Sequence, residues 1–259
     1  MSLLSRLKSM LKVDFRRMLT TPLFYIMVGS SLVMPILILV MTTLMDGTVT
    51  VDPNTGVETV IEGFDNAWQI IASRSDANMM EMGLTTMVNM NLLYFMAAVF
   101  VCLFVAEDFR SGYAKNLFTV RAKKSDYVIS KTLAGITCGM LMIIAFFIGT
   151  LIGGKIAGLP FDLGDLNVGN LIMCMLSKLF LVAVFVPIFL VMSVVGKQRL
   201  WLSLVIAMGA SMLLFTMIPM ICPLDSTIMN VILALAGGTL FSVGIGAISN
   251  LILNKTSLV

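Results

Sequence analysis

The chain has 259 residues, of which 59% are hydrophobic and only 12% are charged. Ordinary soluble domains contain about 45–50% apolar and about 25% charged residues, so this composition excludes them and indicates a membrane protein. The net charge of +3 is too small to indicate nucleic-acid binding. The sequence has no histidine and its four cysteines stand singly in apolar segments, which argues against a thiol redox pair and a zinc site.

Residues 1–20 contain the first predicted element, an amphipathic helix with basic side chains. Apolar residues recur at steps of three and four, while five lysines and arginines occupy most of the remaining circumference. A basic helix with one apolar face is typical of a segment that lies in the membrane interface. A solvated basic tail is the alternative interpretation. Pro22 follows, a residue suited to the first turn of a new helix.

Six apolar segments of spanning length come next, and they predict an all-α polytopic fold with six transmembrane helices. Their approximate ranges are 23–45, 85–105, 127–153, a fourth segment that ends near Val195, then 200–221 and 228–253. Pro35 predicts a kink in the first of them. We therefore expect a single transmembrane domain over residues 1–259.

Residues 46–83 form the longest predicted loop on one side of the membrane. Its first part, TVTVDPNTGVETVI, alternates around the turn residues 52–56 and predicts a hairpin. The following GFDNAWQIIA predicts a short helix, with Trp68 at the depth of the lipid headgroups.

The distribution of basic residues predicts the orientation. All but three of the 17 lysines and arginines lie in the amino terminus, 106–131, 196–200 and the carboxyl-terminal tail. Lysine and arginine accumulate in cytoplasmic loops. Both termini and 106–131 are therefore expected in the cytoplasm, and 46–83 outside.

A nucleotide-binding motif can be rejected. Gly149, Gly154 and Lys155 match the beginning of a phosphate-binding P-loop, but Ile156 stands where Ser or Thr would ligate magnesium. The match also lies at the end of an apolar span rather than between a strand and a helix. We expect no ATPase activity in this chain itself.

Small residues recur at four-residue spacing in two spans. They are Gly135 and Gly139 in the third span, and Ala234, Gly238, Ser242 and Gly246 in the sixth. Such stripes allow helices to approach closely in lipid. They predict either a seam between two subunits or packing within one subunit.

Lys178 is the one charge deep inside a predicted span. A charge at this depth is a functional hypothesis by default. Alternatively, the span begins near Ser177 and the lysine reaches the headgroups. The spans otherwise contain no Asp, Glu or His of the kind that ion-coupled transporters use, so the energy for any uphill transport is expected from outside the chain.

Residues 106–131, AEDFRSGYAKNLFTVRAKKSDYVISK, form a charged segment between two apolar spans. An acidic residue (Glu107), Gly112, a short helix near 116–120, the basic run 121–124 and Ser130-Lys131 follow one another in it. This order resembles the first cytoplasmic loop of ABC-2 type transporter permeases. The resemblance extends over essentially the whole chain: a basic interfacial helix, six spans and both ends inside.

The chain is similar to small Firmicutes-type permeases encoded beside a separate ATPase, including those for bacteriocin, lantibiotic or amphipathic-peptide export and self-immunity. The resemblance implies a bacterial plasma membrane location and a dimer, with an identical or a sister permease. It also implies two ATPase subunits, which bind the ATP and magnesium, and no cofactor on this chain.

The resemblance further implies that the loop helix sits in a cleft of the ATPase as a coupling helix. The implied contact residues are Glu107, Phe109, Arg110, Gly112, Tyr113, Leu117, Phe118 and Arg121. In this interpretation the aromatic and leucine side chains anchor the helix and the arginines form its rim. The alternative is a loop helix that merely lies at the interface.

Three functions therefore remain open. The first is the membrane subunit of an ABC exporter for amphipathic or hydrophobic molecules. The second is a non-transporting sensor, immunity or assembly protein whose outer loop binds a ligand. The third, an ion-coupled secondary transporter, has only Lys178 available for coupling.

Overall fold

The computed structural model describes residues 3–51, 58–74, 88–119, 123–196, 199–215 and 217–255. Its long helices are α1 (Leu3–Thr20), α2 (Pro22–Met45), α4 (Leu93–Arg110), α6 (Lys124–Ala157), α7 (Val168–Gly196), α8 (Leu200–Phe215) and α10 (Ile228–Lys255). Shorter elements are β1 (Val49–Val51), β2 (Glu58–Val60), the 3-10 turns η1 (Ala67–Ile70) and η2 (Met90–Leu92), α5 (Tyr113–Thr119) and α9 (Ile218–Ile221). The predicted all-α polytopic fold is confirmed.

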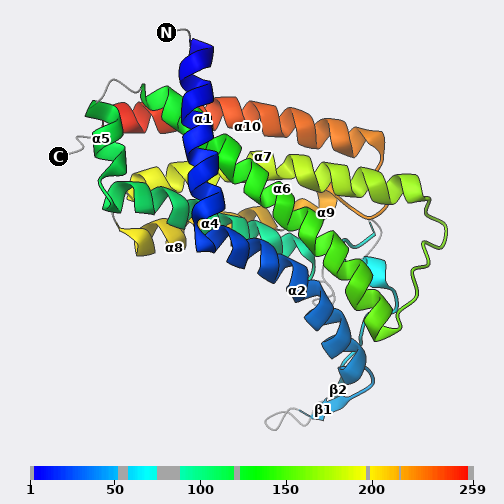
Figure 1. Cartoon of the computed structure of the whole chain (residues 1–259). Coiled ribbons are helices and arrows are strands. Elements are labelled where there is room, and N and C mark those ends of the chain that lie inside the picture. The colour runs from blue at the N-terminus through cyan, green and yellow to red at the C-terminus, as the bar shows by residue number, and fades with distance from the viewer. Residues whose placement is uncertain are drawn as a thin grey trace.

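Five helical segments in the described residues are long and apolar enough to cross a membrane: α2, η2 with α4, α6, α7 and α10. They form a bundle in which α7 lies between α6 and α10, and α1 runs across it (Figure 1). The carboxyl end of α10 and α5 lie at one end of the bundle, which we call the α5 end. The β1–β2 hairpin lies at the opposite end (Figure 1).

The fifth predicted span is shorter than expected. Helix α8 has 16 residues, and the chain turns before the single-turn helix α9. The reason is Pro219, whose ring would collide with the carbonyl group of Phe215 if the helix continued. A turn in which Ser226 N–H donates to Pro223 C=O (3.2 Å) then leads to α10. Residues 217–227 therefore contain the single-turn helix α9 and this turn, and not two helices packed side by side.

The second predicted span also has different bounds. Regular helix begins at Leu93 and continues to Arg110, where the sequence predicted a span over about 85–105. The Asn89 side chain caps the turn η2 by accepting from Asn91 N–H at 3.0 Å, which sets the start of the helical segment. Residues 85–87 lie outside the described residues.

The predicted hairpin is confirmed by the antiparallel pairing of β1 with β2, in which Val49 faces Val60. Its predicted tip, 52–57, lies outside the described residues. The predicted short helix after it is the turn η1. Its Trp68 is buried, with its ring 5.3 Å from Phe161 and 6.1 Å from Phe147. The indole therefore packs inside the protein.

Glycines set the closest helix contacts. A Cβ atom on Gly135 or Gly139 would lie 2.8 or 2.6 Å from valine methyl groups of α7. On the same helix, a Cβ atom on Gly149 would lie only 2.1 Å from the Leu32 carbonyl oxygen, three residues before Pro35 in α2. Helix α2 continues through Pro35 and bends along its length (Figure 1). Helix α6 thus approaches two neighbours at glycines.

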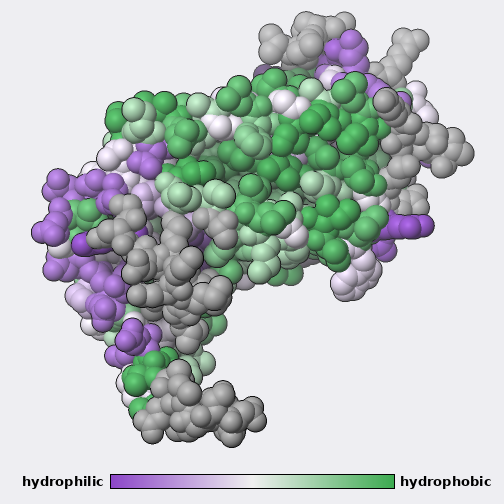
Figure 2. All heavy atoms as spheres, turned by 180° about the vertical axis from the view of Figure 1, so that it is seen from behind, coloured by the Kyte–Doolittle hydropathy of each residue, from purple (hydrophilic) through white to green (hydrophobic). Residues whose placement is uncertain are grey.

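The outer surface of the bundle is apolar. Figure 2 shows a broad hydrophobic band across one face, with polar side chains toward its two ends. Large exposed apolar side chains on α8 and α10 include Val205, Met212, Leu213, Leu240 and Val243. Surface of this kind is stable only against lipid or another protein, so the band marks the part of the molecule in the membrane.

Candidate coupling site

The segment between α4 and α6 is built on a sharp turn at Gly112. Its φ of 73° is left-handed, a conformation that costs a side-chain-bearing residue about 1–2 kcal/mol. Ser111 closes the end of α4, since its N–H and its hydroxyl both donate to the Glu107 carbonyl, at 2.9 and 2.7 Å. Helix α5 begins directly after this turn, so Gly112 sets its direction.

The two faces of α5 differ. Ala114 is buried, and Tyr113, Leu117 and Phe118 are half-buried against the bundle. The Phe118 ring packs edge-on against Tyr127 of α6, with centroids 5.4 Å apart. The apolar side chains expected to contact a partner are therefore partly covered within the chain, and their contact with an ATPase stays a prediction.

The exposed face of α5 is polar. It presents the side chains of Lys115, Asn116 and Thr119, and Ser111 is exposed on the turn before it. Glu107 and Arg110 are exposed at the end of α4, whereas Phe109 is half-buried. Arg121 lies outside the described residues. A partner approaching this end meets a polar surface.

A buried charge network lies beneath α5. Lys131 of α6 places its Nζ 2.9 Å from Asp14 Oδ1 of α1 and 2.7 Å from Asp108 Oδ2 of α4. All three side chains are almost completely shielded from solvent. The ammonium group is within ion-pair distance of both carboxylates but is not aligned for a hydrogen bond to either. It lies 3.8 Å from the Phe104 ring centroid, a favourable position for a cation.

Hydroxyl groups of α6 complete the shell of the two carboxylates. The Ser130 hydroxyl donates to Asp14 Oδ2 at 2.5 Å, and the Tyr127 hydroxyl donates to Asp108 Oδ2 at 3.0 Å. Ser130 and Lys131 follow Tyr127 by three and four residues, so one face of α6 supplies both hydroxyl donors and the ammonium group.

Arg17 extends the network to α5. Its NH1 group donates to Asp108 Oδ1 at 2.6 Å, and its guanidinium lies 4.1 Å from the centroid of the Tyr113 ring. Burial lowers the pKa of Arg17, but the Asp108 carboxylate more than reverses this effect, so the pKa is raised overall. Burial, followed by the charge of Asp14, raises the pKa of Tyr113. The guanidinium therefore remains charged and joins α1, α4 and α5.

The network is electrically balanced, with two carboxylates facing a lysine and an arginine. Removing one member of a buried ion pair costs about 3–5 kcal/mol, because the remaining charge is left without compensation. The four side chains therefore act as one unit. They make the positions of α1, α4 and α6 at this end of the bundle depend on each other, and Tyr113 adds α5 through its contact with Arg17.

Two further contacts surround the start of α6. Arg6 Nε lies 3.4 Å from Asp126 Oδ2, and Lys124 Nζ donates to the Leu253 carbonyl of α10 at 2.6 Å. All ion pairs found among the described residues lie at the α5 end.

The sequence interpretation singled out Lys131 as part of a motif but did not predict its partners. A signal for Asp14 was present, since it lies four residues from both Met10 and Met18, on the face of α1 that the structure buries. A carboxylate on the buried face of an amphipathic helix indicates a buried cation nearby. Asp108 carried no comparable signal, because it follows Glu107 at the polar end of a span.

Lys178 lies in a different part of the bundle. It is fully buried, its Nζ donates to Asn91 Oδ1 at 2.7 Å, and the Tyr94 hydroxyl donates to its carbonyl at 3.0 Å. Helix α7 begins at Val168, ten residues before Lys178, and the lysine side chain points to Asn91 inside the bundle. The structure does not bring Lys178 to the charge network.

The small-residue stripe of α10 faces its own chain. A Cβ atom on Gly238 would lie 3.0 Å from the Ala183 Cβ of α7, and the Ser242 hydroxyl donates to the Ala183 carbonyl at 3.0 Å. Ala234 is buried, and Gly246 turns toward Val128 of α6. The stripe thus lies at contacts inside one subunit.

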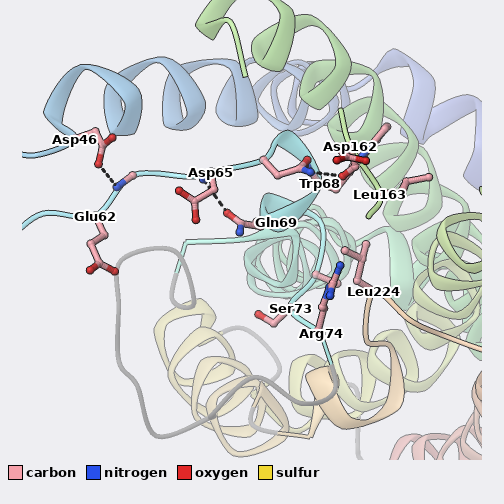
Figure 3. Close-up of a pocket in the computed structure, with 13 residues that line it drawn as sticks. Asp46, Glu62, Asp65, Trp68, Gln69, Ser73, Arg74, Asp162, Leu163 and Leu224 are labelled. Carbon is pink, nitrogen blue, oxygen red and sulfur yellow. Dashed lines mark hydrogen bonds between the residues drawn. The ribbon is translucent and has the colours of Figure 1, made fainter. Parts of the chain in front are cut away.

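The end of the bundle opposite α5 carries the other charge sign. A cavity of about 660 Å³ lies there, formed by the end of α2 and the loops around η1 and before α7 (Figure 3). The charged residues that line it are Asp46, Glu62, Asp65, Asp162 and Arg74. Carboxylates dominate this end, whereas lysines and arginines dominate the α5 end.

Comparison with known protein families connects these features. The family model described as ABC-2 family transporter protein matches residues 11–214, which include α4, α5 and the whole charge network. Comparisons with curated proteins and with solved structures give no match. Because the family model covers well over half of the chain and the fold is that of a polytopic helical membrane protein, the chain belongs to the ABC-2 transporter family as a membrane permease subunit.

Proposed function

We propose that the chain forms the translocation path of an ATP-driven exporter for a hydrophobic or amphipathic substrate, such as a peptide, a lipid-like molecule or a drug. A separate ATPase binds ATP and magnesium, and two ATPase subunits act on a dimer of permeases. The observation that carries this proposal is the contact of α5, through Tyr113 and Arg17, with a charge network of Asp14, Arg17, Asp108 and Lys131 that joins α1, α4 and α6.

The attachment has the mechanical property that coupling needs. A force on the exposed face of α5 is transmitted through the Arg17–Tyr113 contact and the Phe118–Tyr127 contact to α1 and α6. Because these helices share buried charges, tilting one without the others would separate an ion pair in a low-dielectric environment. Helix α5 therefore moves the inner ends of the spans as a group.

The charge distribution supports the orientation that this proposal requires. The α5 end is rich in lysine and arginine, and the opposite end carries the carboxylate-lined cavity. Under the positive-inside rule, the α5 end faces the cytoplasm of a bacterial cell, where the ATPase is available. The hairpin and η1 then face outward.

The exposed face of α5 permits a direct test. Lys115→Glu reverses a charge on that face, and Lys12→Glu makes the same change on the exposed face of α1. Each variant, and the wild-type chain, is co-expressed with the partner ATPase. Copurification of the ATPase and ATP hydrolysis in membrane vesicles are then measured. We expect Lys115→Glu to lower both by about tenfold, and Lys12→Glu to leave both near the wild-type level.

The Lys12 control separates a docking defect from a general effect of charge. Equal, unimpaired ATPase binding by both variants would contradict the assignment of α5. Purification of the wild-type chain without any ATPase would instead favour a sensor, immunity or assembly protein, for which the outer cavity is the candidate ligand site. Tyr113 and Leu117 are unsuitable for this test, because they pack against the bundle.

A further inference from the structure

A narrow apolar groove runs between the inner halves of α6 and α10. Its volume is about 390 Å³. The apolar lining includes Val128, Ile129, Leu133 and Ile136 of α6, with Val243 and Ala247 of α10. Ile129 and Val243 are exposed, so the groove opens sideways on the membrane-facing surface.

The groove has a direction. Its lining runs from Ser125 to Ile136 along α6 and from Asn250 back to Ser242 along α10. Two of its polar residues, Ser125 and Asn250, lie at the α5 end, and the other two, Thr132 and Ser242, lie farther along the groove. The eleven helical steps from Ser125 to Ile136 correspond to a length of about 16 Å. The apolar part therefore extends from the headgroup region toward the middle of the bundle.

The polar mouth of the groove is cationic. Lys123 directly precedes α6 and is exposed, and no ion pair engages it among the described residues. Lys124 uses one donor on the Leu253 carbonyl, which leaves two N–H groups. The nearby carboxylate of Asp126 faces Arg6 at 3.4 Å and is thereby compensated.

The lining and the charge favour one occupant. An apolar lining about 16 Å long matches a single hydrocarbon chain. A phosphate group attached to that chain would meet the lysines at the mouth.

We propose that this groove binds an anionic phospholipid, with one acyl chain between α6 and α10 and the phosphate at Lys123 and Lys124. The groove itself lies between α6 and α10, whereas its lysine mouth adjoins α5, where Lys124 Nζ lies 5.9 Å from the centroid of the Phe118 ring. The bound lipid would hold the inner ends of α6 and α10 together. In the protein alone, these ends face each other across the apolar groove, which the Lys124–Leu253 contact closes only at the α5 end.

Gly246 offers a specific way to block the groove. A Cβ atom at this position would find its nearest neighbour, Val128 Cγ1, at 3.9 Å, which is ordinary contact, so a longer side chain extends into the groove. Gly244 lies on the same helix with nothing within 4 Å and does not line the groove. Both Gly246→Leu and Gly244→Leu add the same side chain to α10. Only Gly246→Leu fills the groove, so Gly244→Leu is the matched control.

The test measures lipid binding to the purified full-length chain by native mass spectrometry. The chain is titrated in detergent with dioleoyl phosphatidylglycerol or with dioleoyl phosphatidylcholine. We expect wild type to bind the anionic lipid about fivefold more tightly, since a lysine near an anionic surface contributes about 1 kcal/mol. Gly246→Leu should weaken binding of both lipids at least tenfold, because the buried chain is lost. Gly244→Leu should bind both as wild type does.

Charge variants test the mouth separately. Lys123→Gln should reduce the preference for phosphatidylglycerol over phosphatidylcholine without abolishing it, because Lys124 remains, and Lys155→Gln, at the other end of α6, should leave the preference unchanged. Ala247→Phe, with Ile248→Phe as control, repeats the blocking test if Gly246→Leu fails to fold by circular dichroism. Unchanged lipid binding in the blocked variants overturns the proposal. A loss of dimer mass with unchanged lipid binding also overturns it and identifies the groove as a protein contact.

Discussion

Lys131 is held between carboxylates of two other helices, and this arrangement makes a prediction at the scale of single residues. Its Nζ is within 3 Å of both Asp14 and Asp108. Replacing Lys131 with Met leaves two buried carboxylates facing only Arg17. We expect Lys131→Met to lower the free energy of unfolding by about 3–5 kcal/mol, measured by thermal or chemical unfolding in detergent.

A second substitution should repair part of this loss. Lys131→Met combined with Asp14→Asn leaves Asp108 paired with Arg17, and the site is neutral again. The amide oxygen introduced by Asp14→Asn can still accept from the Ser130 hydroxyl. The double variant should therefore be more stable than Lys131→Met alone. A double variant that loses the sum of the two single effects would show that the residues do not form one network.

Lys178 and Asn91 allow a similar test elsewhere in the bundle. Lys178→Met leaves the buried Asn91 Oδ1 without its donor, at a cost of about 1–3 kcal/mol. Lys178→Met with Asn91→Leu removes both polar groups, so this double variant should unfold at a higher temperature than the single one. The opposite order would mean that Lys178 serves something other than its contact with Asn91.

At the scale of elements, hydropathy was sufficient to predict the long helices, because a spanning helix is a property of one continuous segment. The hairpin was also predictable, since turn residues separate two alternating runs. The end of α8 was not placed, because a proline can either end a helix or bend it: α2 continues through Pro35, whereas α8 ends four residues before Pro219. The inward packing of Leu117 and Phe118 was missed because it depends on which surface of α6 is close to α5.

The charge network was missed for the same kind of reason. Asp14, Asp108 and Lys131 are separated by 94 and 23 positions along the chain, and only the folded bundle brings them together. Hydropathy and spacing report which side of one helix is buried, as at Asp14, but not which charge on another helix lies opposite.

The contact between α2 and α6 gives the prediction at this scale. Gly149→Ala would place a Cβ atom 2.1 Å from the Leu32 carbonyl oxygen, so the two helices would have to separate. We expect a loss of about 1–3 kcal/mol in the free energy of unfolding. Gly29→Ala is the matched control on α2, since nothing lies within 4 Å of its Cβ position. It should leave stability unchanged or raise it by up to about 1 kcal/mol. Equal effects of the two substitutions would contradict the close contact.

At the scale of the whole molecule, the two ends of the bundle carry opposite charge and different elements. The α5 end holds the ion pairs and the exposed face of α5, and the other end holds the hairpin and the carboxylate-lined cavity. An apolar band lies between them (Figure 2). The proposed function uses this polarity, with force from an ATPase received at the α5 end and substrate released at the other.

Cross-linking from α5 tests the central claim most directly. The four native cysteines are buried, so Lys115→Cys provides one accessible thiol on the exposed face of α5. We expect a thiol-reactive cross-linker to join this position to the partner ATPase in membrane vesicles, with a yield that changes when ATP is bound. Lys155→Cys, exposed at the opposite end of α6, should give no such product. An ATPase cross-link from position 155, or none from position 115 in an active complex, would contradict the account.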